Sequence, residues 1–195
     1  MRAAHGEWVR ASFDALTAGE LYGLLQLRSR VFVVEQDCAF LDLDGVDTLA
    51  GTEHLFLPQP PRAARDSHGA AAGVSLEPAA YARILPEGFA DGPAAAPGAR
   101  SVGRVVTDPA ARGGGLGHLL MEQVVALHGH ADLTLNAQAH LAGFYGRHGF
   151  APSGEGFDED GIPHVPMLRP GTAAAQAVPA RPAPARAEEP LSARR

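Results

Sequence analysis

The sequence predicts an α/β domain, because strand-like and helix-like runs follow one another along the chain. Val105-Val106-Thr107 is β-branched and favours a strand, and an apolar, helix-like run begins at His118. Between them lies Arg112-Gly113-Gly114-Gly115-Leu116-Gly117. A second strand-like run, 132–137, leads into a short helical segment that ends at Gly149-Phe150. This order is typical of domains that pack helices against a sheet.

Two helix and strand signals precede this region. Residues 8–13 favour a first strand, and Thr17 with Glu20 forms the pattern of a capping box at the start of a helix that runs to Phe32. Residues 42–47 indicate a polar turn. Residues 53–57 and 79–85 are predicted to be strands.

Two stretches interrupt these elements. Residues 58–73 and 86–99 are rich in Pro, Ala, Gly and Arg, so each is predicted to be a loop insertion at the end of a hairpin. Residues 170–195 consist mainly of Ala, Pro, Arg and Glu without apolar periodicity. We therefore expect one domain over residues 1–169 and a disordered tail over 170–195.

Composition narrows the class of protein. The chain has 195 residues, is 46% hydrophobic and carries a formal net charge of −6, with all 16 basic residues being Arg. A mildly acidic chain with scattered Arg lacks the basic patch expected of a nucleic-acid binder.

The single cysteine, Cys38, rules out an internal disulfide and a cysteine-based metal site. No apolar run approaches the roughly 20 residues that span a bilayer, and residues 1–8 lack the apolar core of a signal peptide. We expect a cytoplasmic protein with no membrane or nucleic-acid partner and no metal.

The glycine-rich segment between strand and helix is an anion-binding device. Glycines allow close approach of the backbone, and the free N–H groups and dipole of a helix start favour phosphate. A P-loop would need Lys and Ser/Thr after Gly117, where His118 and Leu119 stand, and the dinucleotide-binding fingerprint lacks its third glycine. The segment resembles the Arg/Gln-x-x-Gly-x-Gly/Ala pyrophosphate loop of the GNAT superfamily of acetyl-coenzyme A-dependent N-acyltransferases. Residues 138–150, with Phe144-Tyr145 and Gly149-Phe150, resemble a later motif of that superfamily at the expected spacing.

This resemblance implies a fold and a reaction. The fold is a mixed, mostly antiparallel sheet flanked by helices, with a V-shaped cofactor cleft where two central strands part. The reaction is transfer of acetyl from acetyl-coenzyme A to a primary amine, by direct attack in a ternary complex. The acceptor would be a small-molecule or protein amine, and the enzyme a monomer or a homodimer.

The resemblance also implies residue roles. The loop, Arg112, Gly113, Gly114, Gly115, Leu116 and Gly117, would bind the pyrophosphate, and the strand Val105, Val106 and Thr107 would lie beside the pantetheine arm. Gln138 and Phe144 are further cofactor contacts. Tyr145 stands where the superfamily supplies a proton to the thiolate leaving group. A phenol there either acts as general acid or packs against the cofactor and orients its sulfur.

The first third of the chain narrows the resemblance. Residues 24–36 and 42–47, with His54, and later 136–141 and 159–167, look like the ElaA-like branch of the superfamily, whose substrates are poorly defined. The string from Arg28 to Glu35 also resembles acyl-homoserine-lactone synthases, a lower-ranked alternative. Substrate-side candidates are Arg28, Phe32, Glu35, Asp44, His54 and His164.

Two questions stay open at this stage. No general base stands out among Glu35, His54, His140 and His164. Arg28 and Glu35 lie seven residues apart and are expected on one helix face, two turns from each other. Glu35 with Asp42, Asp44 and Asp47 forms an acidic region, which either recognises a cationic amine or is a solvated loop in which Arg28 makes an internal salt bridge. A non-catalytic module that binds coenzyme A as a sensor is the alternative from another functional class.

Overall fold

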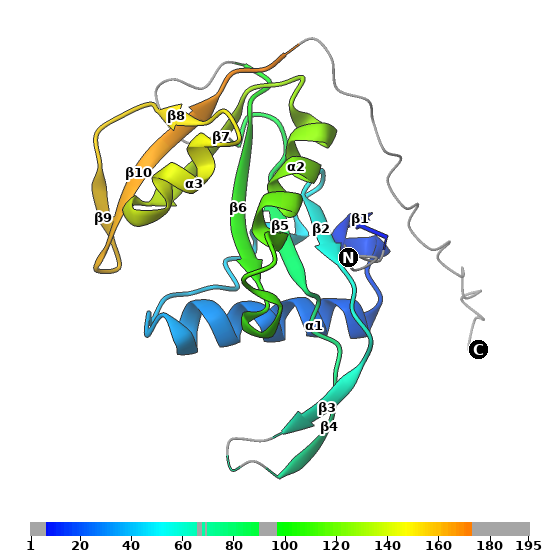
Figure 1. Ribbon diagram of the computed structural model, residues 1–195. Helices are drawn as coiled ribbons and strands as arrows, with labels where there is room; N and C mark the ends of the chain where they lie inside the picture. The colour runs from blue at the N-terminus through cyan, green and yellow to red at the C-terminus, as the bar shows by residue number, and fades with distance from the viewer. Residues whose placement is uncertain (1–6, 66–67, 69, 90–96, 173–195) are drawn as a thin grey trace, which may run out of the picture.

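The structure is a computed structural model, and it describes residues 7–65, 68, 70–89 and 97–172 (Figure 1). Its main sheet has the strand order β1-β2-β5-β6-β7-β10-β8, with β9 paired to β10. The strands are β1 (Val9–Ala11), β2 (Glu53–Leu57), β5 (Ala80–Ile84), β6 (Arg100–Thr107), β7 (Leu133–Gln138), β8 (Ala151–Pro152), β9 (Phe157–Glu159) and β10 (Ile162–Arg169). Within the described residues, neighbouring strands of this sheet are antiparallel except for β6 and β7, which are parallel. The predicted mixed, mostly antiparallel sheet is confirmed.

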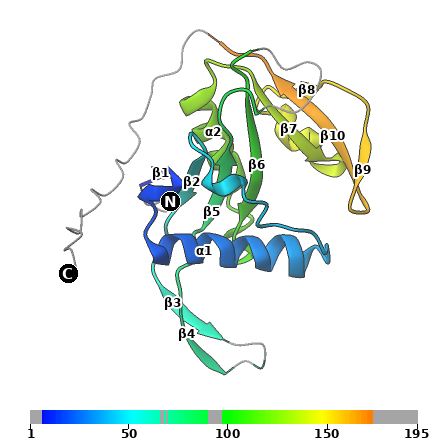
Figure 2. The ribbon, with the colours of Figure 1, turned by 180° about the vertical axis from the view of Figure 1, so that it is seen from behind.

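Helices cover both faces of the sheet (Figures 1 and 2). They are α1 (Ala18–Arg28), α2 (Leu116–His128) and α3 (Ala142–Gly146). Successive side chains of a strand point to opposite faces, so Phe56, Tyr81 and Val106 pack with α1 residues such as Leu24 and Leu27. Their neighbours in sequence face α2 and form the larger core cluster.

The start of α1 follows its sequence signal. Thr17 Oγ1 accepts a hydrogen bond from the N–H of Glu20 at 3.2 Å, and the Glu20 carboxylate accepts the N–H of Thr17 at 2.8 Å. The predicted capping box is confirmed. The end of α1 differs from expectation, because the helix ends at Arg28 and Ser29–Glu35 continues as a wider π-helical segment.

The first predicted loop insertion forms a small β-hairpin instead. Strands β3 (Arg62–Arg65) and β4 (Ala71–Ser75) pair with each other and project from the body of the domain (Figure 1). The Arg- and Ala-rich composition indicated little burial, but a hairpin is held by backbone hydrogen bonds and needs little side-chain burial to form. The second insertion and the tail fall partly outside the described residues, at 90–96 and 173–195.

The two central strands part along most of their length. Register between β6 and β7 is limited to Arg100 with Leu133 and Ser101 with Thr134, after which β7 pairs only with β10. A register shift in β6 opposite Tyr81 and Arg83 coincides with a positive φ of 52° at Arg104. Such bulges bend a strand and redirect its edge, which here helps β6 diverge from β7. The predicted V-shaped cleft is confirmed.

Candidate active site

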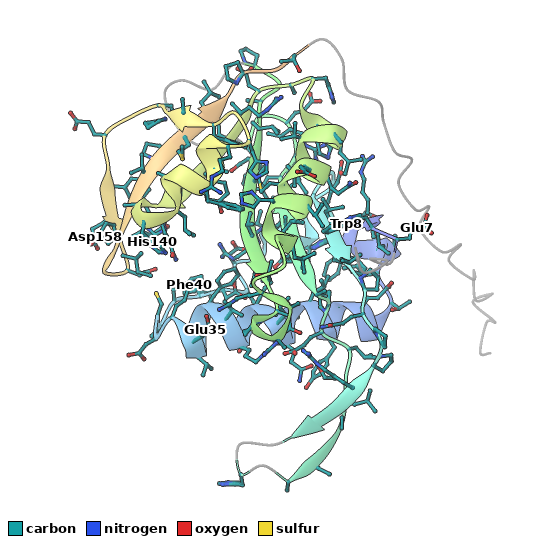
Figure 3. The ribbon with its side chains drawn as sticks, viewed as in Figure 1. Glu7, Trp8, Glu35, Phe40, His140 and Asp158 are labelled. Atoms are coloured by element: carbon teal, nitrogen blue, oxygen red, sulfur yellow. The ribbon has the colours of Figure 1, made fainter. Side chains whose placement is uncertain are left out.

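A cavity of about 640 Å³ lies between the parted strands. Its walls come from β6, β7, the start of α3, the β9–β10 hairpin and the segment that follows α1. Its lining includes Phe32, Gln36, Cys38, Phe40, Asp44, Arg83, Arg104, Val105, Gln138, Tyr145, Asp160 and His164. Figure 3 shows Glu35 and Phe40 on the α1 side of this region and His140 and Asp158 on the side of α3 and β9.

The edge of β6 that faces the cavity has free backbone groups. The N–H of Asp108 donates to the carbonyl of Ala79, the residue before β5, at 2.9 Å. Backbone groups of successive strand residues point to alternate sides, so those of Val105 and Thr107 turn toward β7. The Thr107 carbonyl accepts a hydrogen bond from Nη2 of Arg112 at 3.5 Å. Because β7 has separated from β6 at this level, the N–H groups of Val105 and Thr107 and the Val105 carbonyl lie on an open strand edge, which suits an extended ligand that carries amides.

The glycine loop follows β6 directly. Asp108 caps the turn Pro109–Ala111, its carboxylate accepting the N–H of Ala110 at 3.1 Å. Gly113 and Gly115 have φ values of 86° and 80°, a left-handed conformation that favours glycine. Gly115 is the N-cap of α2. Among the described residues, no backbone hydrogen bond from the N–H groups of 113–117 is present, so the loop presents donors at a helix start.

Of the expected cofactor residues, Val105 and Gln138 line this cavity, whereas Val106, Thr107, Phe144 and the loop residues 112–117 lie outside its lining. Val106 and Phe144 pack beneath the strand and the loop. A Cβ atom on Gly117 would lie 3.4 Å from the ring of Phe144, so that ring supports the first turn of α2. The side chain of Val106 is buried in the α1-facing cluster. Val106 would therefore contact a ligand only through its backbone, and Phe144 would act only by supporting the glycine loop.

Tyr145 lies at the cavity from α3, which packs against β7. Its side chain is largely buried, and burial raises the pKa of its phenol to about 12. The phenol is therefore neutral, and able to donate a hydrogen bond, at pH values near neutrality.

Gln138 and His164 are brought together although 26 positions separate them in sequence. They are opposite partners in the β7–β10 register, and both line the cavity. The Gln138 amide donates to Oε1 of Gln36 at 3.1 Å. Nδ1 of His164 lies 2.8 Å from the carbonyl oxygen of Ile162, and its ring stacks on Phe157 with centroids 5.8 Å apart.

The aspartates of the predicted polar turn are neutralised from within the protein. Arg28 is 1% exposed and donates to Asp42 at 3.0 Å and to Asp47 at 2.8 Å. Arg83 and Arg104 bind Asp44 at 2.7 and 3.1 Å. Three guanidinium groups thus face three carboxylates, which favours the internal salt bridge over recognition of a cationic amine by these aspartates.

Arg28 and Glu35 do not share a helix face, and this expectation was wrong. The π-helical segment changes the rotation per residue after Arg28, which faces the interior, while Glu35 lies near the surface. Glu35 instead pairs with Arg112, Nη1 to Oε1 at 2.6 Å. This pair ties the segment after α1 to the glycine loop, and it engages the Arg112 side chain that was expected to serve the pyrophosphate.

The four candidate bases differ in whether they reach the cavity. His54 is 1% exposed, with Nδ1 2.9 Å from the hydroxyl of Tyr81 and Nε2 3.2 Å from the carbonyl of Asp47, and it does not line the cavity. Burial, together with the nearby Arg28 and Arg83, lowers its pKa. His140 is exposed and also outside the lining. Glu35 is held by Arg112. His164 is the candidate base that reaches the cavity.

Sequence reasoning missed several cavity residues. Arg104 stands at the strand bulge, contacts Asp42 at 2.7 Å and lies over the Phe40 ring, 5.2 Å from its centroid. Cys38, remote from the motifs in sequence, lines the same cavity, with Sγ 3.9 Å from the carbonyl of Asp160. A non-glycine bulge residue has no sequence signal. These side chains meet only through tertiary packing.

The chain is similar to known proteins over most of its length. Residues 77–169 match the family model described as acetyltransferase (GNAT) domain. Protein ElaA of Escherichia coli is 36% identical over 84% of this chain and 95% of its own length, and a UPF0039 protein of Mycobacterium tuberculosis is 39% identical over 80% and 88%. The crystal structure of an acyl-CoA N-acyltransferase from Pseudomonas aeruginosa, 39% identical, covers 84% of this chain and 99% of its own with a TM-score of 0.65. The crystal structure of Escherichia coli ElaA, 35% identical, covers 84% and 98% with a TM-score of 0.64.

The cleft, the glycine loop and these matches define an acetyltransferase of the GNAT type, which uses an acyl-coenzyme A donor. Within that superfamily, this chain belongs to the family of ElaA and the UPF0039 proteins. In the described part of the chain, no helix is long and apolar enough to cross a membrane, and no group of three or more His, Cys, Asp or Glu side chains could hold a metal ion.

Proposed function

We propose that this protein transfers the acetyl group of acetyl-coenzyme A to a primary amine of a small molecule or a protein, by direct attack in a ternary complex. The observation that carries the proposal is the continuity of β6 with the glycine loop. One strand offers free backbone groups beside a cavity, and the same chain then presents the N–H donors of a helix start. An extended donor with amide groups at one end and phosphates at the other fits that order.

Acetyl as the acyl group is supported by the relatives. The matched family model carries the description acetyltransferase (GNAT) domain. A Bacillus subtilis relative described as a putative acetyltransferase is 29% identical over 77% of this chain.

In the proposed reaction, the neutral amine attacks the thioester carbonyl carbon. A C–N bond forms, the C–S bond breaks, and the thiolate sulfur takes a proton. The N–H of Val105 or Thr107, on the open edge of β6, would stabilise the negative charge on the carbonyl oxygen. The phenol of Tyr145 would donate its proton to sulfur, and solvent would restore it.

His164 is our proposed base for the amine. A carbonyl oxygen only accepts hydrogen bonds, so the contact with Ile162 requires the proton on Nδ1. Nε2 is then left with the lone pair that could take a proton from the amine. The other three histidine and glutamate candidates lack either access to the cavity or a free acceptor atom.

The first experiment is calorimetric titration with acetyl-coenzyme A, with coenzyme A and ATP as controls, followed by thiol release in the presence of a panel of amines. Micromolar binding of the first two ligands with weak ATP binding, and amine-dependent thiol release, would support the proposal. Binding without thiol release for any amine would favour a sensor module. Absence of binding would refute the cofactor assignment. Because the chain contains no lysine, acetylation of its own lysine side chains cannot contribute to the signal.

A further inference from the structure

The glycine loop depends on a single side chain for its contact with the rest of the domain. Of residues 112–115, only Arg112 has a side chain, and a Cβ atom at any of the three glycines would meet no atom within 4 Å. Arg112 donates from Nη1 to Oε1 of Glu35 at 2.6 Å and from Nη2 to Oε2 at 3.2 Å. A glycine-rich loop has large conformational freedom, so ordering it around a ligand costs free energy unless another group already holds it.

Glu35 reaches the loop from the π-helical segment Ser29–Glu35, which continues α1 (Figure 3). The N–H of Gln36 donates to the carbonyl of Val31 at 3.0 Å, a hydrogen bond between residues five apart. Residues five apart in such a helix lie nearly above one another, whereas in an α-helix they would be about 140° apart around the axis. The segment therefore aligns side chains that an α-helix would separate.

Arg30 and Glu35 are five residues apart, and both bind the connection between β6 and α2. Nη2 of Arg30 lies 3.0 Å from Oδ1 of Asp108, which is 0% exposed. Glu35 binds Arg112, so the two contacts lie on either side of the turn Pro109–Ala111. The π-helical pitch thus lets one face of the segment hold the connection at two points, and the contact made by Glu35 is the one next to the glycines.

We propose that Glu35 is a positioning residue for the acyl donor: through Arg112 it holds the glycine loop in the conformation that binds phosphate, and the π-helical pitch brings it there. This inference rests on the proposed function, because it takes coenzyme A as the ligand of the loop. The segment also carries Phe32, and Gln36 directly after it, to the cavity wall. It therefore sets the position of the loop relative to the cavity.

Glu35→Gln separates positioning from simple electrostatics, because the two predict opposite changes in the Kd of coenzyme A. By charge alone, removing a carboxylate near a phosphate site would tighten binding. Loss of the contact that holds Arg112 would weaken it, and we expect a Kd about threefold larger, as is usual for a partly exposed ion pair. An unchanged or smaller Kd in the folded variant, measured by calorimetric titration, would overturn the proposal.

The matched control for the charge is Glu122→Gln. It removes an exposed carboxylate of α2 that forms no ion pair with any described residue. The Kd of coenzyme A should not rise in this variant. A rise equal to that of Glu35→Gln would mean that the loss is not specific to the contact with Arg112, and would overturn the proposal.

The helical pitch has a test of its own. Val34 is 72% exposed, and it is the residue that an α-helix would place next to Arg30, four positions earlier. The double variant Val34→Glu/Glu35→Val keeps one carboxylate in the segment but moves it by one position. We expect it to bind coenzyme A as weakly as Glu35→Gln does, and wild-type affinity would refute the role of the pitch.

A double-mutant cycle tests whether Glu35 acts through Arg112. In the background of Arg112→Gln, which lacks the guanidinium that Glu35 binds, Glu35→Gln should not weaken binding further. Equal weakening in both backgrounds would show that Glu35 acts by another route, against the proposal. Thermal unfolding of each variant would verify that it is folded. A wild type that bound no coenzyme A would refute the proposed function instead, which is a distinguishable result.

Discussion

Nδ1 of His164 lies 2.8 Å from the carbonyl oxygen of Ile162, two residues earlier on the same strand, β10. This contact selects the tautomer of the ring and leaves Nε2 as the acceptor. With Nε2 as an acceptor, His164 is predicted to act as the base in catalysis.

Replacing His164 by Asn should lower kcat by about 10²- to 10⁴-fold, the usual contribution of a general base, with little change in the Kd of acetyl-coenzyme A. His140→Asn, at an exposed position outside the lining, is the control. Equal kcat values for the two variants would remove His164 from the mechanism.

Tyr145→Phe should lower kcat roughly 10²-fold while the Kd of acetyl-coenzyme A changes little, because only the proton donor is lost. Since burial raises the pKa of Tyr145 to about 12, ionisation of this phenol should not reduce turnover below about pH 10. Steady-state kinetics across that range would test both statements. The exposed Tyr22→Phe on α1 is the matched control. Full activity of Tyr145→Phe would mean that the ring only orients the donor.

Gly115→Ala should weaken acetyl-coenzyme A binding at least about tenfold, because a left-handed conformation costs a residue with a Cβ about 1–2 kcal/mol and the loop would shift to escape it. The effect is conformational, since a Cβ at Gly115 would meet no atom within 4 Å. Gly73→Ala, in β4, has a φ of 101° and equally open surroundings. That control should show a similar loss of thermal stability but wild-type affinity. Weakened binding in Gly73→Ala would show that general destabilisation explains both.

Asp108→Asn should destabilise the fold by about 1–2 kcal/mol near neutral pH. Burial opposes ionisation of this carboxylate, but hydrogen bonds from Gln59, Arg30, the N–H of Ala110 and Arg62 outweigh it and hold its pKa at about 2. A lowered pKa stabilises the native state above the unfolded value of about 4, and this stability is lost as pH falls toward 2. Urea unfolding of wild type and variant should therefore converge in acid. A constant difference at all pH values would contradict the assignment, and the exposed Asp14→Asn should have no effect.

Arg28→Leu should destabilise the protein by about 3 kcal/mol, because the buried Asp42 and Asp47 each lose one of their two arginine partners and keep only Arg104 and Arg83. The triple variant that adds Asp42→Asn and Asp47→Asn removes those charges and should recover part of the loss. Denaturant unfolding provides the comparison. If the triple variant were no more stable than Arg28→Leu, packing of the arginine stem would explain the loss better than its charge.

Local signals in the sequence were sufficient for much of the fold. Thr17 and Glu20 predicted the start of α1 because a capping box involves only four consecutive residues. The β-branched run at 105–107 and the glycines after Arg112 predicted a strand, a turn and a helix start, since each depends on backbone preferences of neighbouring residues. The same local motifs predicted the family, and the comparisons confirm it.

Long-range contacts decided the rest. The pairing of Arg112 with Glu35 and the burial of His54 against Tyr81 join residues far apart in sequence, and no local preference encodes them. The helical pitch changes after Arg28, whose side chain pairs with Asp42 and Asp47, so α-helical periodicity alone mispredicted which face Glu35 occupies. Adjacent residues were enough to predict most strands, the start of α1, the glycine loop and the family, but not the β3–β4 hairpin or the end of α1. Which histidine reaches the cavity depends on the register of β10 against β7, a long-range pairing that no local pattern encodes.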